Sequence, residues 1–239
     1  MSVQLSVVVP VKDEAANVGP LAREIAAALA TEAPHEIIFV DDGSSDGTAD
    51  ALQSLKREIP ALRVLRHERN LGQSRGIRSG ALAAHGDILI TLDGDGQNDP
   101  ADIPKLLRAL EAEPNVGLVS GVRTKRKDTA SRRLASRLGN RFRNWLLKDG
   151  AADTGCGLKA FRRDLFLAMP YFDHIHRFLI ALALREGVEV RFVPVNHRPR
   201  TAGQSKYTNF GRLLVSGADL LGVRWLQRRH KGRAGVTEL

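Results

Sequence analysis

The first half of the chain alternates short apolar runs with segments in which apolar residues recur at helical spacing. The runs predict buried strands, over Val3–Val11, Glu36–Val40, Leu62–Leu65, Asp87–Leu92 and Val116–Ser120. The spacing predicts helices beginning near Val18 and Asp46, and over Gln73–Ala84 and Pro100–Ala112. Strands and helices that alternate with short connections predict an α/β fold with an open, mostly parallel, doubly wound sheet flanked by helices.

The second half of the chain is more basic and less regular. A basic segment, Lys125–Lys148, carries apolar residues on one predicted helical face. The elements expected after it are a Gly-containing segment over Asp153–Phe161, a helix over His176–Glu186, a strand over Val188–His197 and a polar loop over Arg198–Thr208. We therefore divide the chain into a domain of residues 1–210 and a basic amphipathic helix and tail of residues 211–239.

That last helix is predicted to run to about Arg229 with one apolar stripe. The stripe consists of Leu213, Leu214, Gly217, Leu220, Leu221 and Trp225. With basic residues around it, the stripe could lie on an anionic membrane surface. Packing of its first half on the core, followed by a solvated basic tail, is the alternative.

Composition narrows the class of protein. With 239 residues, of which 43% are hydrophobic, the chain can bury one sizeable α/β core. A single cysteine, Cys156, excludes an internal disulfide. The longest stretch without a charged residue, Met1–Val11, is too short to span a bilayer and lacks a charged n-region, so we expect neither a transmembrane helix nor a signal peptide.

The net charge of +9 is concentrated in the second half. The run Arg123–Arg143 contains nine Lys or Arg residues against one acid, Asp128. Such a run is either a solvated helix face or a sign of an anionic partner: nucleic acid, a phosphorylated substrate or a membrane. Only 5% of the residues are aromatic and no nucleic-acid motif is present, which argues against a nucleic-acid-binding protein.

The stretch Asp87–Pro100, DILITLDGDGQNDP, holds the clearest candidate chemistry. Asp93 and Asp95 follow a buried strand, and carboxylates at i and i+2 there suit a divalent cation with oxygen ligands. A polar turn is the alternative. An EF-hand is excluded because its sixth position would be Asn98 instead of Gly and its twelfth Pro104 instead of Glu.

Two further polar loops are expected at the same rim of a parallel sheet. Pro10 and Glu14 follow the first strand, and Asp41 and Asp42 follow the second. Capping of the next helix by Asp46 or Thr48 is the alternative role for this second loop. Three acidic loops on one rim favour a cation-assisted nucleotide site, while the lack of GxGxxG or GxxxxGK[ST] after the first strand argues against a dehydrogenase or a P-loop enzyme.

In their order along the chain, these segments resemble the GT-A glycosyltransferases of family 2. The segments are VVVPVKDEAANV, IIFVDDGSSDGT, LDGDGQNDP, DTGCGLKAFRR and RPRTAGQSKYT. The chain is most similar to polyprenyl-phosphate glycosyltransferases of the dolichol-phosphate mannosyltransferase type. The resemblance covers almost the whole chain and implies a GT-A (Rossmann-like) sheet with a C-terminal helical extension.

It also implies inverting, metal-dependent transfer of a sugar from GDP-mannose or a UDP-sugar to a polyprenyl phosphate of the dolichyl or undecaprenyl type. The product would serve envelope glycan or lipid A glycosylation. A soluble GT-A enzyme that glycosylates a polysaccharide or protein hydroxyl is the alternative. The implied location is the cytoplasmic face of a membrane, with the protein bound to the surface or to a separate membrane subunit.

The resemblance assigns roles to particular residues. Those implied to bind the nucleotide are Pro10, Glu14, Asp41, Asp42 and Asp93. Those implied to hold Mg²⁺ or Mn²⁺ are Asp93, Asp95 and Gln97. Those implied to bind the acceptor phosphate are Arg123, Arg132, Arg133, Ser136 and Ser205, the register of the arginine helix staying open. Those implied to act in catalysis are Asp95, Arg200 and Lys206, the last two in an RxxGxSK signature.

The chemistry accounts for these residue types. Negative charge builds on the leaving diphosphate, and a divalent cation with Arg and Lys stabilises it. A phosphate nucleophile is already ionised at neutral pH, so a strong general base is not needed. The loop Asp153–Gly157 departs from the Ser-Gly-Phe that is common in the family, which leaves the donor sugar open: mannose, glucose or a uronic acid. The pair His174 and His176 lacks a third metal ligand nearby, so we expect loop or core histidines.

Overall fold

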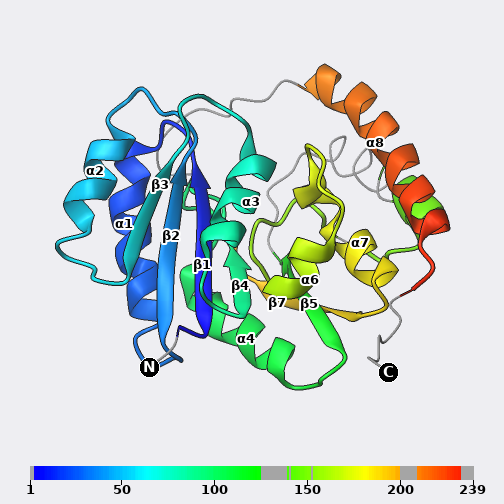
Figure 1. Cartoon of the computed structure of the whole chain (residues 1–239), viewed down its shortest axis with the longest axis horizontal. Coiled ribbons are helices and arrows are strands. Elements are labelled where there is room, and N and C mark those ends of the chain that lie inside the picture. Colours follow the sequence, from blue (N-terminus) through cyan, green and yellow to red (C-terminus); the bar gives the residue numbers. More distant parts are fainter. Residues whose placement is uncertain (1–2, 125–138, 140, 152, 200–208, 233–239) are drawn as a thin grey trace, which may run out of the picture.

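The computed structural model describes residues 3–124, 139, 141–151, 153–199 and 209–232, with the backbone alone over 209–216. These residues form a seven-stranded sheet in the order β3-β2-β1-β4-β6-β5-β7 (Figure 1). The strands are β1 Leu5–Val11, β2 His35–Asp41, β3 Leu62–Arg66, β4 Ile88–Thr91, β5 Val116–Arg123, β6 Lys159–Arg162 and β7 Glu189–Val195. The helices are α1 Ala15–Ala28, α2 Thr48–Leu55, α3 Gln73–Ala83, α4 Ile103–Glu111, α6 Arg163–Ala168, α7 Leu179–Arg185 and α8 Asn209–Arg229, with 3-10 helices η1 Pro100–Asp102 and η2 Ile175–Arg177.

The predicted mostly parallel sheet is confirmed, with one strand that the hydrophobic pattern did not predict. Strand β6 runs antiparallel between β4 and β5, whereas β1, β2, β3 and β4 pair in parallel, as do β5 and β7. The helix expected over His176–Glu186 is divided into η2 and α7. Strand β6 places Lys159 directly beside Thr91 of β4, and therefore beside the start of the DGDG loop.

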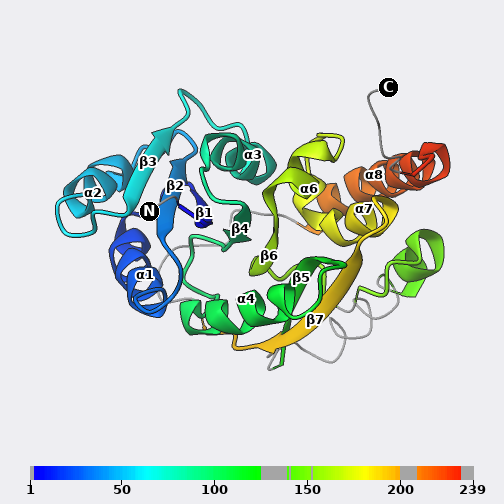
Figure 2. The same ribbon diagram turned by 60° about the horizontal axis from the view of Figure 1, so that its bottom comes forward.

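Alternate residues of the central strands face two separate cores. Val7 and Val9 of β1 pack in a cluster with α1, α2 and α4, whereas Val8 packs in a second cluster with α3, α6 and α7. Figure 2 shows α1 and α4 on one side of the sheet and α3, α6 and α7 on the other. Because both faces are covered, all seven residues of β1 are buried, as in a doubly wound sheet.

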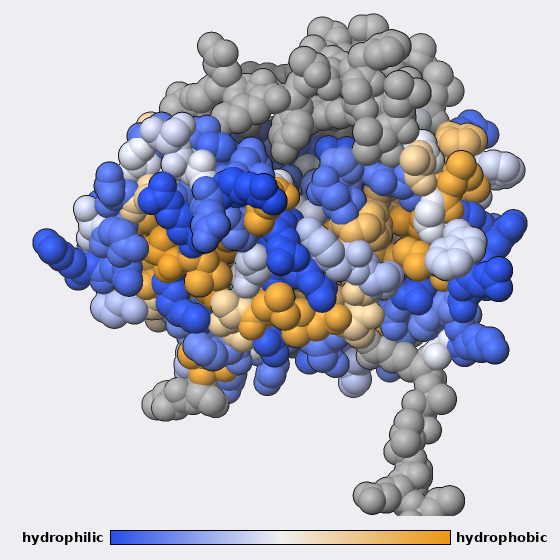
Figure 3. All heavy atoms as spheres, turned by 45° about the horizontal axis from the view of Figure 1, so that its top comes forward, coloured by the Kyte–Doolittle hydropathy of each residue, from blue (hydrophilic) through white to orange (hydrophobic). Residues whose placement is uncertain are grey.

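The predicted apolar stripe of α8 is divided, since Leu220 packs against the second core. Leu221 and Trp225 are 66% and 58% exposed, while Val223 is 1% exposed and packs in the second core. Residues 221 and 225 lie one turn apart on the same side of a helix, and residue 223 lies on the opposite side. The side chains of Leu213 and Leu214 lie outside the described residues. Figure 3 shows apolar surface along the side of the molecule where α8 lies.

Among the described helices, none combines the length and the apolar character that crossing a membrane requires.

Candidate active site

A cleft of about 770 Å³ opens at the carboxyl ends of β1, β2 and β4. Loops that follow parallel strands meet at one rim, where open α/β sheets bind ligands. The structure therefore brings together residues that lie far apart in the sequence. The predicted site residues that line the cleft are Pro10, Glu14, Asp42, Asp93, Asp95, Gln97 and Arg123.

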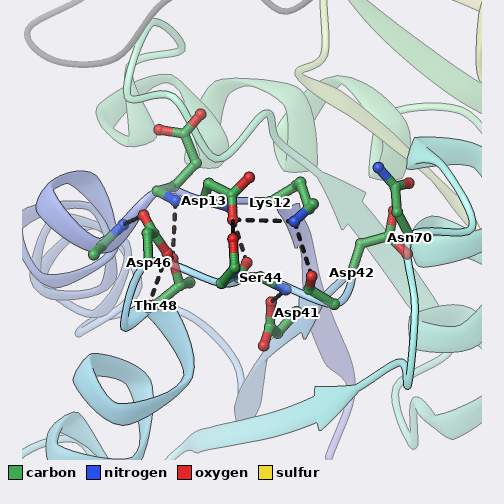
Figure 4. Close-up of polar contacts among 12 residues, drawn as sticks. Lys12, Asp13, Asp41, Asp42, Ser44, Asp46, Thr48 and Asn70 are labelled. Atoms are coloured by element: carbon green, nitrogen blue, oxygen red, sulfur yellow. Dashed lines mark hydrogen bonds and ion pairs between the residues drawn. The ribbon is translucent and has the colours of Figure 1, made fainter.

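The loops after β1 and β2 are joined by a network of polar contacts (Figure 4). Lys12 Nζ donates to Asp13 Oδ1 at 3.0 Å and to the Gly43 carbonyl at 2.8 Å. In return the Asp13 amide donates to Ser44 Oγ at 2.8 Å, and the Ser45 amide donates to Asp13 Oδ1 at 2.8 Å. These contacts fix one loop against the other and so define the rim of the cleft.

Asp46 lies one residue before Gly47, the N-cap of α2, and is hydrogen-bonded to the start of that helix. Its carboxylate accepts hydrogen bonds from the amide of Thr48, the first residue of α2, at 3.1 Å and from the Ala15 amide at 3.1 Å. Burial opposes ionisation of Asp46, but the hydrogen bonds from Thr48 and Ala15 outweigh it and lower the pKa of this carboxyl group.

The neighbouring acids Asp41 and Asp42 have different positions. Asp41 is fully buried, accepts a hydrogen bond from the Ser44 amide at 2.9 Å and pairs with Arg66 Nε at 3.2 Å. It does not line the cleft. Asp42 does line the cleft. Its carboxylate accepts hydrogen bonds at 2.7–2.8 Å from three donors, the amides of Leu71 and Gly72 and the His67 ring, and so fixes the adjoining part of the cleft wall.

Asp93 is held in place from two sides. Gln73 at the start of α3 donates from Nε2 to Asp93 Oδ1 at 2.7 Å. On the other side Gly157 lies so close that a Cβ at this position would be 2.3 Å from Asp93 Oδ2. Neither contact was predicted, because both partners lie outside the DGDG motif and reach it only through α3 and β6.

The electrostatics around Asp93 fit a bound cation. Burial and then the charge of Asp95 raise the pKa of Asp93 to about 6, although Lys159 and Arg123 act in the opposite direction. The described residues contain no group of three His, Cys, Asp or Glu side chains that could hold a metal. Mg²⁺, however, usually binds through one or two carboxylates and the phosphates of the substrate. The pair Asp93 and Asp95, with Gln97 beside it, therefore suits a cation that arrives with a diphosphate.

The third acid of the stretch, Asp99, has a structural role. Its Oδ1 accepts hydrogen bonds from the Ala101 amide at 3.1 Å and from Arg198 Nη2 at 2.6 Å. The Arg198 amide donates to the Gln97 carbonyl at 2.9 Å. These contacts anchor the chain just before the RxxGxSK signature on the DGDG loop. Arg200, Ser205 and Lys206 themselves lie outside the described residues.

Cationic side chains lie close to the acids in the cleft. Arg123 forms a bidentate ion pair with Asp153, both distances being 2.7 Å. Lys159 is 4% exposed and donates to the Cys156 carbonyl. Burial lowers the pKa of Lys159, and nearby negative groups, Asp93 among them, partly offset this. The other predicted acceptor-phosphate residues, Arg132, Arg133 and Ser136, lie outside the described part of the chain.

His176 and Arg177 also line the cleft, and the sequence did not identify them as site residues. His176 Nδ1 lies 2.7 Å from Ser74 Oγ. Burial, followed by the charge of Arg177, lowers the pKa of His176 to about 3, so its ring is neutral. A second metal site at His174 and His176 is not favoured, since the described residues contain no group of three His, Cys, Asp or Glu side chains that could hold a metal.

The fold and the cleft together define a class of protein, an open α/β protein with a ligand cleft at the carboxyl ends of its parallel strands. The sequence pattern of Glycosyl transferase family 2 matches residues 6–168. The chain belongs to this family, and it is a glycosyltransferase with a GT-A fold.

Curated relatives match nearly the whole chain. It is 36% identical to a dodecaprenyl-phosphate galacturonate synthase of Rhizobium johnstonii over 98% of this chain and 70% of that protein. It is 37% identical to an undecaprenyl-phosphate 4-deoxy-4-formamido-L-arabinose transferase of an Enterobacter species over 91% of this chain and 66% of that protein. The chain thus spans about two thirds of the length of these relatives.

Solved structures share the fold at lower identity. The mannosyl-3-phosphoglycerate synthase of Rubrobacter xylanophilus superposes with a TM-score of 0.70 at 21% identity, over 98% of this chain and 77% of that one. A Pyrobaculum calidifontis mannosyltransferase in complex with GDP-Man and Mn²⁺ gives a TM-score of 0.66 at 22% identity, over 98% and 66% of the two chains.

Proposed function

We propose that this enzyme transfers a sugar, with inversion, from a GDP- or UDP-linked donor to the phosphate of a polyprenyl phosphate. The observation that carries the proposal is that one cleft contains both kinds of charge. Asp93 and Asp95 line it, and so do Arg123, Lys159 and Arg177. The relatives at 36–37% identity, whose names specify dodecaprenyl and undecaprenyl phosphate, support the choice of acceptor.

Each kind of residue in the cleft has its own part in the reaction. Pro10, Glu14 and Asp42 would hold the nucleoside at the rim formed by β1 and β2. Asp93, Asp95 and Gln97 would hold Mg²⁺ or Mn²⁺, which neutralises charge on the leaving diphosphate when bound. Among the cationic residues, Arg123 would orient the acceptor phosphate together with Arg132, Arg133 and Ser136, because guanidinium groups match phosphate geometry.

We expect the RxxGxSK segment to take part in the same site. Arg198, whose amide donates to the Gln97 carbonyl, lies two residues before Arg200 in the sequence. Cationic groups at that point would stabilise the transition state by electrostatic complementarity. A phosphate acceptor supplies its own anionic oxygen, so the cleft does not have to provide a strong base.

The direct test is incubation of the purified protein with radiolabelled sugar nucleotides, Mn²⁺ and a short polyprenyl phosphate. We expect a lipid-soluble product with one donor, and loss of at least about 100-fold in rate for Asp95→Ala. No product with any donor would refute the proposal. Transfer to a sugar or peptide hydroxyl, but not to the lipid phosphate, would support the alternative of a soluble hydroxyl-directed enzyme.

For the location, we propose peripheral binding at the cytoplasmic face of an anionic membrane. Four large apolar side chains are exposed on two adjacent helices: Phe142 and Trp145 of the helix at residues 141–147, and Leu221 and Trp225 of α8. Gln227 of α8 donates to the Leu147 carbonyl at 3.0 Å, which holds the two helices together. Basic residues accompany these side chains, among them Arg141, Lys148, Arg224, Arg228 and Arg229. Aromatic and basic side chains on one surface suit the boundary of an anionic bilayer.

Vesicle flotation tests this location. The protein should float with anionic vesicles in low salt, less in high salt, and the double variant Trp145→Ser/Trp225→Ser should float markedly less. Leu82→Ser is a matched control, because Leu82 of α3 is 55% exposed and lies outside this surface. Wild-type protein that stays unbound would contradict direct surface binding and leave a separate membrane subunit as the docking partner.

A further inference from the structure

The segment Asp173–Phe178 is placed between the donor cleft and the C-terminal helix. His176 and Arg177 line the cleft beside Gln73, and Gln73 holds Asp93. A displacement of this segment would therefore alter the shape and charge of the wall that faces the proposed cation.

On its outer side the segment contacts α8 through a polar pair between described residues. His174 Nδ1 lies 3.1 Å from Asp219 Oδ2, and the two side chains are 28% and 19% exposed. Asp219 is the only acidic residue in the sequence of α8, whose other charged residues are arginines. The one acid of a basic helix thus lies against the loop that enters the active site.

The backbone at His174 depends on such contacts. Its φ is +66°, in the left-handed region that residues other than glycine adopt rarely. The Asp173 carboxylate accepts a hydrogen bond from the His174 amide at 2.8 Å, and Asp219 contacts the imidazole ring of His174. Left-handed residues that are held by surrounding groups occur often at functional sites.

Two further supports of the segment lie on its inner side. His176 contacts the buried Ser74, and Arg143 donates to the Arg177 carbonyl at 3.2 Å while it forms an ion pair with the buried Asp149 at 2.7 Å. Asp219 differs from these supports because it belongs to a helix that exposes Leu221 and Trp225 on its other side. Its contact with His174 is therefore a polar route by which a change in the position of α8 reaches the segment.

We propose that Asp219 is a positioning residue. Through His174 it holds the segment Asp173–Phe178 in the position in which His176 and Arg177 form the cleft wall. It thereby links the position of α8 against the core to the binding of the sugar nucleotide. This inference rests on the proposed function, since it assumes that the donor binds in this cleft.

A double-mutant cycle on the full chain tests the link. The variants are His174→Ala, Asp219→Ala, the double variant and Asp219→Asn, which keeps an oxygen that can accept a hydrogen bond from the ring. Glu113→Ala is the control, because it removes a surface ion pair with Arg191 at 2.7 Å on β7. The readouts are the Kd of GDP and UDP with Mn²⁺, and kcat and KM for the donor and the acceptor separately.

We expect each single alanine variant to raise the donor KM about five-fold, with the acceptor KM nearly unchanged, and the double variant to do no more than one of them. Asp219→Asn and Glu113→Ala should resemble the wild type. A general loss of folding would instead lower the apparent kcat and leave both KM values unchanged, and circular dichroism would detect it.

The outcomes separate the two proposals. If the wild type binds neither GDP nor UDP in the presence of Mn²⁺, the donor site and the proposed function both fail. If the wild type binds a nucleotide and the alanine variants keep its donor KM, or if their effects add, the link through Asp219 is wrong and the proposed function stands.

Discussion

The carboxylate of Asp93 depends on one glycine that is not part of its own motif. A Cβ at residue 157 would lie within 2.5 Å of all three carboxyl atoms of Asp93. Gly157→Ala must therefore displace the carboxylate or the loop that carries residue 157. We predict that transfer falls by at least about ten-fold, and that more Mn²⁺ is needed for half-maximal rate.

The control for this substitution is Gly222→Ala in α8, since a Cβ at residue 222 would meet nothing within 4 Å. It should retain the activity and the Mn²⁺ requirement of the wild type. If Gly157→Ala has the same Mn²⁺ dependence as the wild type, then the function of Asp93 does not depend on its close contact with Gly157.

A second consequence of the crowded acids concerns stability. The pKa of Asp93 is raised from 3.8 to about 6 in the folded protein, so ionisation at neutral pH works against folding when no cation is bound. The Asp93 carboxyl group therefore contributes to the free energy of unfolding at low pH, and this contribution is lost as the pH rises through about 6. Asp93→Asn removes the buried charge. We predict that in EDTA at pH 8 the variant is more stable than the wild type by about 1–3 kcal/mol, although it is inactive.

Urea unfolding at pH 8 and at pH 5 measures this difference. The gain should shrink at pH 5, where the wild-type carboxyl group is largely protonated. A variant that is less stable than the wild type in EDTA at pH 8 would contradict the interpretation that the acids form a strained, cation-accepting pair.

At the scale of elements, helix α3 must lie close to β1 for Gln73 to reach Asp93. A Cβ on Gly80 of α3 would lie 2.3 Å from Val8 Cγ1, and Val8 is 1% exposed in the core. Alanine usually stabilises a helix by about 1 kcal/mol over glycine, but overpacking costs about 1–3 kcal/mol. We predict that Gly80→Ala lowers the free energy of unfolding, and that adding Val8→Ala restores part of the loss. Urea titrations of the two variants check this, and an increase in stability for Gly80→Ala alone would contradict the close packing.

The hydrophobic pattern predicted most elements, and its errors have physical causes. The parallel strands are long apolar runs because both of their faces are buried, so they are visible in the sequence. Strand β6 has four residues, Lys159–Arg162, and is specified by pairing with β4 and β5, which no local signal reports. The sequence did not decide which side of α8 faces the core, because apolar residues occur on several sides of this helix and the position of the core decides which of them are buried.

The candidate site also has a part that the sequence predicts and a part that it does not. The DGDG loop, Glu14 and Asp42 could be predicted because each directly follows a strand and is polar. The partners that hold them come from distant segments: Gln73 is 20 residues from Asp93, and Gly72 is 30 residues from Asp42. Such pairs follow from tertiary packing and leave no periodic signal in the chain.

In the whole molecule, the sheet separates two hydrophobic cores, and the cleft opens where the loops of both halves meet. A donor bound there would contact both halves, so it should stabilise the fold as a unit. A nucleotide at 100 times its Kd adds about 2.7 kcal/mol, which corresponds to a rise in Tm of about 5–10 °C for a chain of this size. We predict such a rise for either GDP or UDP with Mn²⁺, and its loss in EDTA or in Asp95→Ala.

A thermal-shift panel of sugar nucleotides then addresses the donor sugar. Lys159, Arg123 and Arg177 line the cleft on the side away from the nucleoside residues Pro10 and Glu14, and a carboxylate on the sugar would find positive charge there. We predict that UDP-galacturonate raises Tm more than UDP-glucose, and that Lys159→Met reduces this difference. Asp93 and Asp95 repel an acidic sugar unless a cation is bound, so the preference should also disappear in EDTA. Equal shifts for the two sugars with Mn²⁺ present would mean that the cationic wall serves only the phosphates, and that shape rather than charge selects the sugar.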